Sequence, residues 1–414
     1  EPGFTLFNAR RLGFQGTSDQ SFDQNFGLLV ILDRSGEPVW YYRTDSRISD
    51  FNVLPNGHIL YLTQDYRAVE IDLLGNEVAS WYAAGRPQGE AEGTPVETIT
   101  FHHDIEQLHT GNLLVLGSEQ REIEDYYSSE TDPDAPRSTQ TVMGDRVLEF
   151  DPATGEIVWS WNAFAHMDPF RIGYDTFSPY WPRRGFPNTL DWSHANALVP
   201  RPGQDAVLVN FRLQSAITQI DRRTGRIEWI FGEHSGWPEE LEDALLEPQG
   251  DMRWPYHQHA PMLTDRGTLL LFDNGNFQAR PFEEPAAPNE TRSRVVEYAI
   301  DREEGTVRQI WSSEEADVEP VVSFAMGDVE VLPETGNVLA GYGFVFPPEH
   351  MDEITWENFD QWPIWTMVRE FTHTSDPKLV WEVRIGRGEE LPVGWTLFGV
   401  ERLSSLDPFP ERAR

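Results

Sequence analysis

The sequence predicts an all-β protein, a six-bladed β-propeller built from four-stranded blades. Two repeats that alternate along the chain, and a composition suited to short strands, carry this prediction. The 414 residues include 32 glycines and 30 prolines, and 12% of them are aromatic, which favours short strands joined by many turns. Alternating repeats, each too small to bury a core alone, are typical of propellers.

The first repeat is a short frame that begins with a variable residue and ends four positions later in leucine. Histidine fills the variable position twice, as His194 and His259. In a propeller the first strand of each blade lines the central channel, so we expect the variable residues to converge there. The six copies of this frame span residues 50–54, 104–108, 194–198, 259–263, 328–332 and 399–403.

The second repeat is an apolar strand, an Asp, a turn with Gly and a second strand that carries a Trp. Asp and Gly supply the turn chemistry of a hairpin, and we expect the Trp to cap the outgoing strand. The two repeats alternate, which gives four strands for each unit. The last copy is degraded. The six copies lead to Trp40, Trp81, Trp159, Trp229, Trp311 and Trp381.

We expect one domain over residues 1–414, with long connections at about 120–141, 162–190, 231–256 and 345–365. The first connection is rich in Glu, Asp, Ser and Thr and predicts a solvated loop. The other three contain aromatic residues and predict lids that bind flat rings, because long loops are uncommon unless they are functional. Pairing of the N-terminal strand near residues 4–7 with the C-terminal frame would close the ring and remove an exposed edge.

The chain is acidic, with 32 basic and 69 acidic residues and a formal charge of −37. This charge argues against nucleic acid and anionic membrane surfaces as partners. There is no cysteine, so disulfides, thiol nucleophiles and thiolate metal sites are excluded. We expect no membrane span, because no long apolar run is present, and no signal peptide within this chain, because no apolar stretch follows Glu1.

The candidate catalytic residues are histidines of the inner frames. Because strand side chains alternate, we expect His257 and His259 to share a face. His194 and His259 would then meet across the channel, with His102 or His103 nearby. A single histidine of this kind is more simply explained as a structural residue whose hydrogen bonds are satisfied. Several histidines in register on inner strands favour a functional site instead.

Arg212 lies between apolar residues of a predicted strand just after His194, so we expect it to point inward. An arginine that points into the interior needs an anion to balance its charge, so we expect it to bind an anionic group of a substrate. Histidine with arginine suits transfer of a phosphoryl or sulfuryl group, in which neutral imidazole is the nucleophile, protonated imidazole serves the leaving oxygen, and arginine stabilises the equatorial oxygens. A three-histidine metal site from His102, His194 and His259 is the less favoured reading.

Several motifs resemble the bacterial arylsulfotransferases, which move a sulfuryl group between phenols without a nucleotide sulfate donor. The resemblance covers roughly residues 28–345 and is strongest over 191–311. This chain resembles a short form, because the better-known members carry an extra N-terminal β-domain and a disulfide. The motifs are Asp-Trp-Ser-His-Ala-Asn at 191–196, Arg212 with Gln214, Gln-His-Ala at 258–260, Phe-Asp-Asn-Gly at 272–275, and Arg-Val-Val-Glu-Tyr at 294–298 with the hairpin at 301–307.

The resemblance implies a six-bladed propeller and a ping-pong cycle through a sulfohistidine. It implies that His259 is the nucleophile and that His194 and Arg212 bind and polarise the sulfate, while His102 or His103 completes the pocket. It also implies a small-molecule aryl sulfate donor, a phenolic acceptor, no cofactor or metal, and a periplasmic or secreted location. The candidate substrate-binding residues are Asn196, His257, Asn274 and Trp192.

Three alternatives stay open at this point, as does the oligomeric state. A sulfate or phosphate ester hydrolase would use the same histidines with water as the acceptor, and added phenol would not accelerate it. A non-enzymatic propeller scaffold would keep its partner affinity after His259→Ala. A polysaccharide lyase would use His as base and Arg to neutralise charge.

Overall fold

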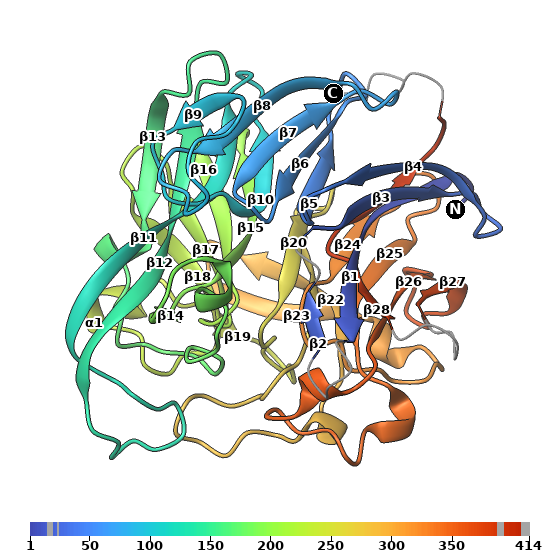
Figure 1. The fold of residues 1–414 in the computed structure, drawn as a ribbon. Coiled ribbons are helices and arrows are strands. Elements are labelled where there is room, and N and C mark those ends of the chain that lie inside the picture. The colour runs from blue at the N-terminus through green and yellow to red at the C-terminus, as the bar shows by residue number, and fades with distance from the viewer. Residues whose placement is uncertain (15–19, 23–24, 387–392, 407–414) are drawn as a thin grey trace.

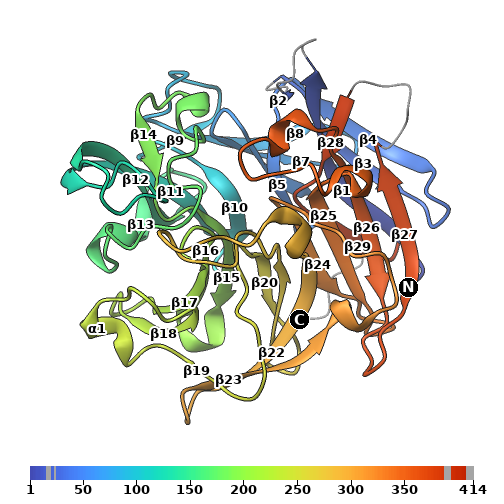
Figure 2. The ribbon, with the colours of Figure 1, turned by 90° about the horizontal axis from the view of Figure 1, so that it is seen from below.

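Six small antiparallel sheets form a ring, and each sheet is one blade of a β-propeller (Figures 1 and 2). The computed structural model describes residues 1–14, 20–22, 25–386 and 393–406. Figure 2 shows the inner strands near the middle of the ring, with the outer strands of each blade on its periphery. The predicted six-bladed propeller with four-stranded blades is confirmed.

The strands of each blade are given from the channel outward. Blade 1 contains β29 (Val400–Leu403), β1 (Phe4–Phe14), β3 (Gly27–Leu32) and β4 (Pro38–Thr44); blade 2 contains β5 (Ile48–Val53), β6 (Ile59–Thr63), β7 (Arg67–Ile71) and β8 (Glu77–Ala83); and blade 3 contains β10 (His102–Gln107), β11 (Leu113–Tyr126), β12 (Ser138–Phe150) and β13 (Ile157–Asn162). Blade 4 contains β15 (Ala195–Arg201), β16 (Ala206–Phe211), β17 (Ala216–Asp221) and β18 (Ile227–Gly232); blade 5 contains β20 (His259–Leu263), β21 (Leu269–Asp273), β22 (Arg294–Asp301) and β23 (Thr306–Ser312); and blade 6 contains β24 (Asp328–Val331), β25 (Val338–Val345), β26 (Trp365–Phe371) and β27 (Leu379–Ile385). Short strands extend the blades: β2 (Gln20–Phe22), β9 (Thr94–Val96), β14 (Thr189–Asp191), β19 (Glu247–Pro248) and β28 (Val393–Thr396). The helices are short: α1 (Glu239–Glu242) and the 3-10 helices η1 (Ala163–Ala165), η2 (Pro182–Arg184), η3 (Pro202–Gln204), η4 (Pro288–Glu290), η5 (Ser313–Glu315), η6 (Pro348–His350) and η7 (Phe359–Gln361).

The two ends of the chain close the ring within blade 1. β29 is the innermost strand of that blade and pairs antiparallel with β1, with Phe4 opposite Leu403 and Phe7 opposite Val400. The predicted pairing of N- and C-terminal strands is therefore confirmed. It also completes the blade, since neither end alone supplies four strands.

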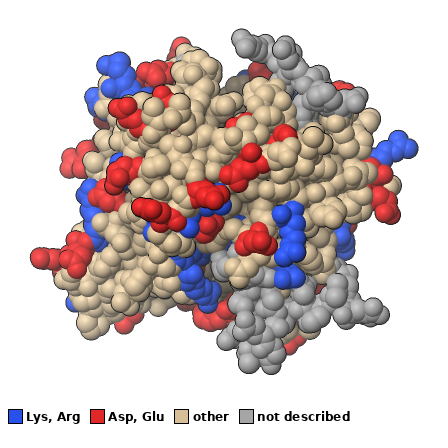
Figure 3. Space-filling view, turned by 45° about the horizontal axis from the view of Figure 1, so that its top comes forward, with Lys and Arg blue, Asp and Glu red and all other residues tan. Residues whose placement is uncertain are grey.

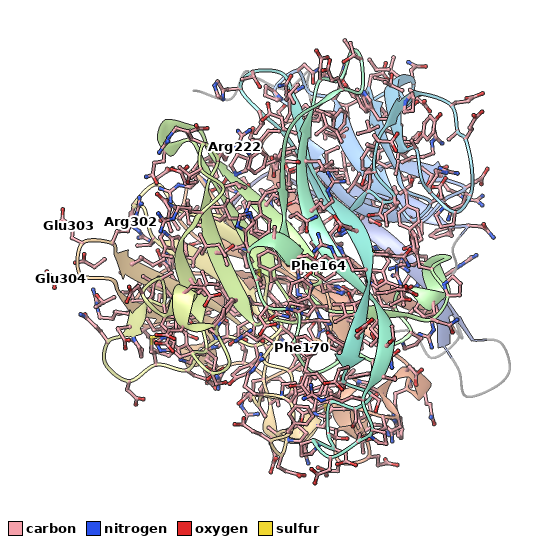
Figure 4. The ribbon with its side chains drawn as sticks, turned by 90° about the vertical axis from the view of Figure 1, so that its left-hand side faces the viewer. Phe164, Phe170, Arg222, Arg302, Glu303 and Glu304 are labelled. Atoms are coloured by element: carbon pink, nitrogen blue, oxygen red, sulfur yellow. The ribbon has the colours of Figure 1, made fainter. Side chains whose placement is uncertain are left out.

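The repeated tryptophans connect neighbouring blades. Trp81 of blade 2 donates its indole N–H to Pro152 O, 2.8 Å away in a turn of blade 3. Trp159 of blade 3 donates in the same way to Arg222 O at 2.7 Å, in the β17–β18 turn that Figure 4 labels. The repeat thus supplies a bond between blades in addition to the predicted cap on its own strand. The other three such bonds join Trp40 to Leu73 O, Trp311 to Thr374 O and Trp381 to Arg34 O.

Trp229 of blade 4 is the exception, because its indole N–H has no hydrogen-bond partner. A chain segment lies between blade 4 and blade 5 instead. Ile230 N donates to Ala244 O at 2.7 Å, and Glu247 N donates to Gly305 O at 2.9 Å, so residues 244–247 bridge the two blades. This segment belongs to the long connection predicted at 231–256.

The aspartates of the inner frame join blades across the channel wall. Asp104 accepts a hydrogen bond from Leu198 N of the next inner strand at 2.6 Å. Asp328 accepts one from Val400 N at 2.7 Å, which ties blade 6 to blade 1. A carboxylate in the variable position is therefore structural, whereas histidine leaves the position open for other contacts.

The predicted loop at about 120–141 is wrong at both ends. β11 continues to Tyr126 and β12 begins at Ser138, so the two strands form a long hairpin, with Ile123 opposite Gln140. Figure 1 shows this hairpin extending beyond its blade. Its polar side chains indicated a loop, but an antiparallel pair needs only backbone hydrogen bonds and tolerates polar residues on a solvated face. The other three long connections are largely irregular, with only short helices and strands.

No helix in the described part of the chain is long and apolar enough to cross a membrane. On the face drawn in Figure 3, acidic side chains lie scattered among basic and uncharged ones rather than in one continuous patch. On this face the acidic side chains are therefore spread out rather than gathered in one patch.

Candidate active site

The inner strands are irregular where they carry histidines. β10 and β20 each have a register shift next to the histidine, and His103, His194 and His257 have left-handed backbones with φ of 57°, 48° and 56°. Bulges re-aim side chains, and strained backbones concentrate at functional sites. The regular alternation expected for His257 and His259 does not apply, because β20 begins only at His259.

His259 is held in one tautomer by Asn274. The amide nitrogen of Asn274 donates to Ser323 O at 2.8 Å and Met326 O at 2.9 Å, so its oxygen faces His259 Nδ1 at 2.7 Å. An amide oxygen only accepts, so Nδ1 carries the proton. Nε2 then presents its lone pair, which accepts from Met326 N at 3.2 Å.

His194 is oriented by a carboxylate from its own loop. Its Nδ1 bonds Asp191 Oδ2, and Trp181 Nε1 donates to the other carboxylate oxygen at 2.9 Å. Both His194 and Asp191 are buried. The imidazole of His194 packs against two aromatic rings, with centroid distances of 4.7 Å to His103 and 4.6 Å to Tyr180.

Of the adjacent pair, His103 faces His194 and His102 supports it. His102 Nε2 lies 3.1 Å from Gly117 O and 3.2 Å from Asp145 Oδ1. Since a carbonyl only accepts, this Nε2 carries a proton, while His102 Nδ1 lies 2.9 Å from His103 Nδ1. His103 Nε2 lies 3.3 Å from the hydroxyl of Tyr180.

Arg212 is buried with part of its guanidinium unused. Its Nη1 donates to Asp175 Oδ2 at 2.9 Å, and its backbone N donates to His194 O at 3.0 Å. Its Nε and Nη2 are buried without a hydrogen-bond partner. Unpartnered donors of a buried cation are costly in free energy, and an anion would satisfy them.

The other predicted binding residues differ in their surroundings. His257 is buried beside the charge of Arg212, and its Nδ1 has no partner. The amide of Asn196 is occupied, since it donates to Gln258 O and accepts from Asn210. Trp192 belongs to the hydrophobic core, where it stacks on Phe164 at 4.8 Å and donates to Arg171 O.

Burial and neighbouring cations keep three of these imidazoles, those of His103, His257 and His259, neutral. Burial, followed by the charge of Arg212, lowers the pKa of both His259 and His257 well below the usual range. Burial and then His194 lower the pKa of His103 in the same direction. Among the residues that the structure describes, no group of three or more His, Asp or Glu could hold a metal ion, and His102 points away toward Gly117.

Comparison with known proteins decides the family. The family model described as "Arylsulfotransferase (ASST)" matches residues 2–370. The chain belongs to the arylsulfotransferase family.

Two proteins named "Arylsulfate sulfotransferase AssT" are relatives of this chain. One is from Lelliottia amnigena and one from Escherichia coli O6:H1, and each is 24% identical over 334 residues. The match covers 68% of this chain and 52% of each relative, so the chain spans about half the length of the curated relatives it matches. A solved structure of a protein of unknown function from Bacteroides caccae covers 96% of this chain and 99% of its own, with 12% identity and a TM-score of 0.46.

Aromatic residues that the sequence did not single out lie beside these histidines. Tyr180 stacks on His103 at 5.9 Å, and the Phe398 ring lies 5.8 Å from His103 and 6.1 Å from His259. Tyr180 comes from the connection predicted as an aromatic lid at 162–190. Phe398 immediately precedes the C-terminal frame, and nothing in its local sequence indicated a role.

A second aromatic group packs beside Arg212. Phe324 lies 5.4 Å from the Arg212 Cζ, and Phe359 packs on Phe324 at 4.1 Å. Trp356 packs on Phe277 at 4.4 Å in the same buried cluster. The connection at 345–365 therefore contributes its rings to this side of the pocket.

Proposed function

We propose that this protein is a sulfotransferase that moves a sulfuryl group from an aryl sulfate to a phenolic acceptor through a sulfohistidine at His259. The observation that carries the proposal is the neutral His259, with its Nδ1–H fixed by Asn274, beside an arginine whose Nε and Nη2 lack partners. Family membership and the names of the relatives support the same activity. We further propose a periplasmic or secreted location, on the family resemblance alone.

In the first half of the proposed reaction, the sulfate oxygens take up the free N–H groups of Arg212 and displace the Met326 N–H from His259 Nε2. Nε2 then attacks sulfur, and the sulfur–oxygen bond to the ring breaks with its electron pair on the leaving phenolate. Arg212 and His194 stabilise the charge on the equatorial oxygens. The proton stays on His259 Nδ1, which donates it in a hydrogen bond to Asn274 Oδ1.

In the second half, a phenol enters and gives its proton to Nε2 of neutral His103. The phenolic oxygen attacks sulfur, the nitrogen–sulfur bond breaks, and its electron pair returns to His259 Nε2. His103 passes its proton to solvent. The products are the new aryl sulfate, the first phenolate and one proton, so the cycle balances without a cofactor.

The test is the intact mass of the protein after brief exposure to 4-nitrophenyl sulfate without acceptor. The expected result is a gain of about 80 Da, one SO₃ group, that is absent in His259→Asn. His234→Asn is the matched control, because this half-buried histidine contacts Leu246 O rather than the pocket, and it should keep the gain. Release of nitrophenol without any adduct, unaffected by added phenol, would point to hydrolysis and overturn the proposal.

A further inference from the structure

A buried carboxylate lies behind the two adjacent histidines of the pocket. Asp145 on β12 is 2% exposed, and His102 on β10 is 4% exposed. Asp145 Oδ1 lies 3.2 Å from His102 Nε2, and His102 Nδ1 lies 2.9 Å from His103 Nδ1. We call His102 and His103 the imidazole pair. A continuous line of polar contacts therefore runs from Asp145 through the imidazole pair to His103 Nε2.

The carboxylate of Asp145 is hydrogen-bonded, but no arginine or lysine balances its charge. Ser193 Oγ donates to Asp145 Oδ2, and Ala195 N donates to the same oxygen at 2.7 Å. In the part of the chain that the structure describes, the ion-pair partner of Asp145 is the imidazole of His102. Burial of a charge without an opposite charge costs free energy. A positive charge on His102 is therefore favoured by Asp145.

His103 needs such a partner because its own surroundings resist protonation. Burial lowers the pKa of His103 well below its usual range. In the proposed second half-reaction, however, His103 Nε2 takes the proton of the phenolic acceptor. An imidazole in these surroundings holds that proton poorly unless the positive charge moves to a place beside a carboxylate. Four neighbouring groups that can carry positive charge lower the pKa of His103 further: His194, His102, His259 and Arg184.

The other groups that pack against the imidazole pair supply no negative charge at neutral pH. Three aromatic rings lie at centroid distances of 5.7 to 5.9 Å from one or the other imidazole: Trp181, Tyr180 and Phe398. Of these only Tyr180 can titrate, and burial raises its pKa. The nearby carboxylate of Asp191 bonds His194 instead. Among the described residues, Asp145 is therefore the carboxylate in contact with the imidazole pair.

We propose that Asp145 and His102 are positioning residues for the acceptor step, and that His102 holds the proton while His103 takes it from the phenol. Before the acceptor binds, the proton shared by the two Nδ1 atoms lies on His103. The phenolic O–H bond then breaks as an N–H bond forms at His103 Nε2, and the shared proton moves to His102 Nδ1. His102 becomes a cation beside Asp145, while His103 stays neutral. After the sulfated product leaves, the reverse movements release the proton to solvent.

The inference rests on the proposed function and adds which acceptors depend on Asp145. A phenol that still holds its proton needs a base, whereas a phenolate does not. Transfer to phenol should therefore require Asp145, and transfer to an ionised acceptor should not. Sulfurylation of His259 by 4-nitrophenyl sulfate should not require Asp145 either, because the leaving nitrophenolate takes up no proton.

The test compares two acceptors at about pH 8, with 4-nitrophenyl sulfate as the donor. Phenol keeps its proton at this pH, as tyrosine does. Ring-deuterated 4-nitrophenol is ionised, and mass spectrometry detects the sulfate that it gains by exchange. We expect Asp145→Asn and His102→Gln to lower kcat/KM for phenol about tenfold to a hundredfold, and to change that for the deuterated nitrophenol less than about twofold. The Gln amide can still donate to Gly117 O, so His102→Gln decides if Asp145→Asn does not fold.

Asp104→Asn is the matched control. Asp104 on β10 is also buried and accepts from Leu198 N of β15, much as Asp145 accepts from Ala195 N of the same strand. Any effect of this variant should be the same for both acceptors. Equal losses for both acceptors in Asp145→Asn and His102→Gln, with His259 still sulfurylated, would overturn the inference and leave the proposed function intact. Absence of the His259 adduct and of transfer to either acceptor in the wild type would overturn both.

Discussion

A neutral amide, and not a carboxylate, fixes the tautomer of His259. The amide nitrogen of Asn274 donates to two main-chain carbonyls, which fixes the orientation of the amide. The amide oxygen of Asn274 therefore points toward His259 Nδ1. An Asp in this place would also attract a second proton to the ring and so quench the Nε2 lone pair. The amide thus orients the ring, while burial and Arg212 keep it neutral.

Replacement of Asn274 by alanine should slow sulfurylation of His259 roughly tenfold to a hundredfold, because the reactive tautomer is no longer fixed. The bond to Asn274 raises the pKa of His259, so its loss should also move the acidic limb of the kcat/KM profile to lower pH. The measurement is the rate of 4-nitrophenol release against pH. An unchanged limb with a lowered rate would mean that Asn274 acts only through structure.

Asn276→Ala provides the control for this prediction. Asn276 is equally buried and donates to Phe324 O in the same neighbouring segment, but it does not touch His259. Its loss should lower stability to a similar degree and leave the position of the acidic limb unchanged.

Some of these site residues could be predicted from sequence, and others could not. His194 and His259 occupy the variable position of a repeated frame, and Arg212 lies between apolar strand residues, so their placement followed from periodicity. The choice between His102 and His103 depended on a left-handed backbone at His103, which strand alternation cannot reveal.

At the scale of the hairpin repeat, the indole N–H bond between blades should be measurable. Trp81 and Trp229 occupy equivalent places and are equally buried, at 4% and 5% exposed, but only Trp81 has a hydrogen-bond acceptor. Both Phe variants lose the same ring volume. Trp81→Phe should therefore lower the free energy of unfolding by about 1 kcal/mol more than Trp229→Phe, as denaturant titration can measure. Equal losses would mean that the bond contributes nothing.

The long hairpin of β11 and β12 shows where element prediction failed. Acidic and hydroxyl residues between 120 and 141 indicated a loop, yet the two strands pair there and their tip reaches the pocket lid. Glu130 at the tip accepts from Asp175 N at 3.0 Å and from Phe177 N. Asp175 in turn bonds Arg212, so a solvated hairpin supports the site from outside. Long-range contacts of this kind leave no periodic signal.

At the scale of the whole ring, the inner aspartates and the histidines act on stability in opposite directions. Burial raises the pKa of Asp104 to about 6 and that of Asp328 to about 7. Their stabilising effect is complete below about pH 4, where both folded and unfolded chains hold the proton, and is lost as pH rises through 6 to 7. The buried neutral histidines, with lowered pKa values, stabilise above about pH 6.5 and lose this effect as pH falls.

A single-site variant separates these opposing contributions. Asp328→Asn keeps an oxygen that accepts the hydrogen bond from Val400 N, but its side chain cannot ionise. The free energy of unfolding of the variant therefore does not fall when Asp328 of the wild type ionises. Its stability relative to wild type should therefore rise from about pH 4 to about pH 7 and then level off, by about 1.4 kcal/mol in total for each pKa unit that separates the folded from the unfolded state. Thermal unfolding at unit pH intervals measures this. A constant difference between Asp328→Asn and wild type would mean that this carboxyl group ionises normally in the ring, and the inner strands would then tolerate a full charge where the structure buries one.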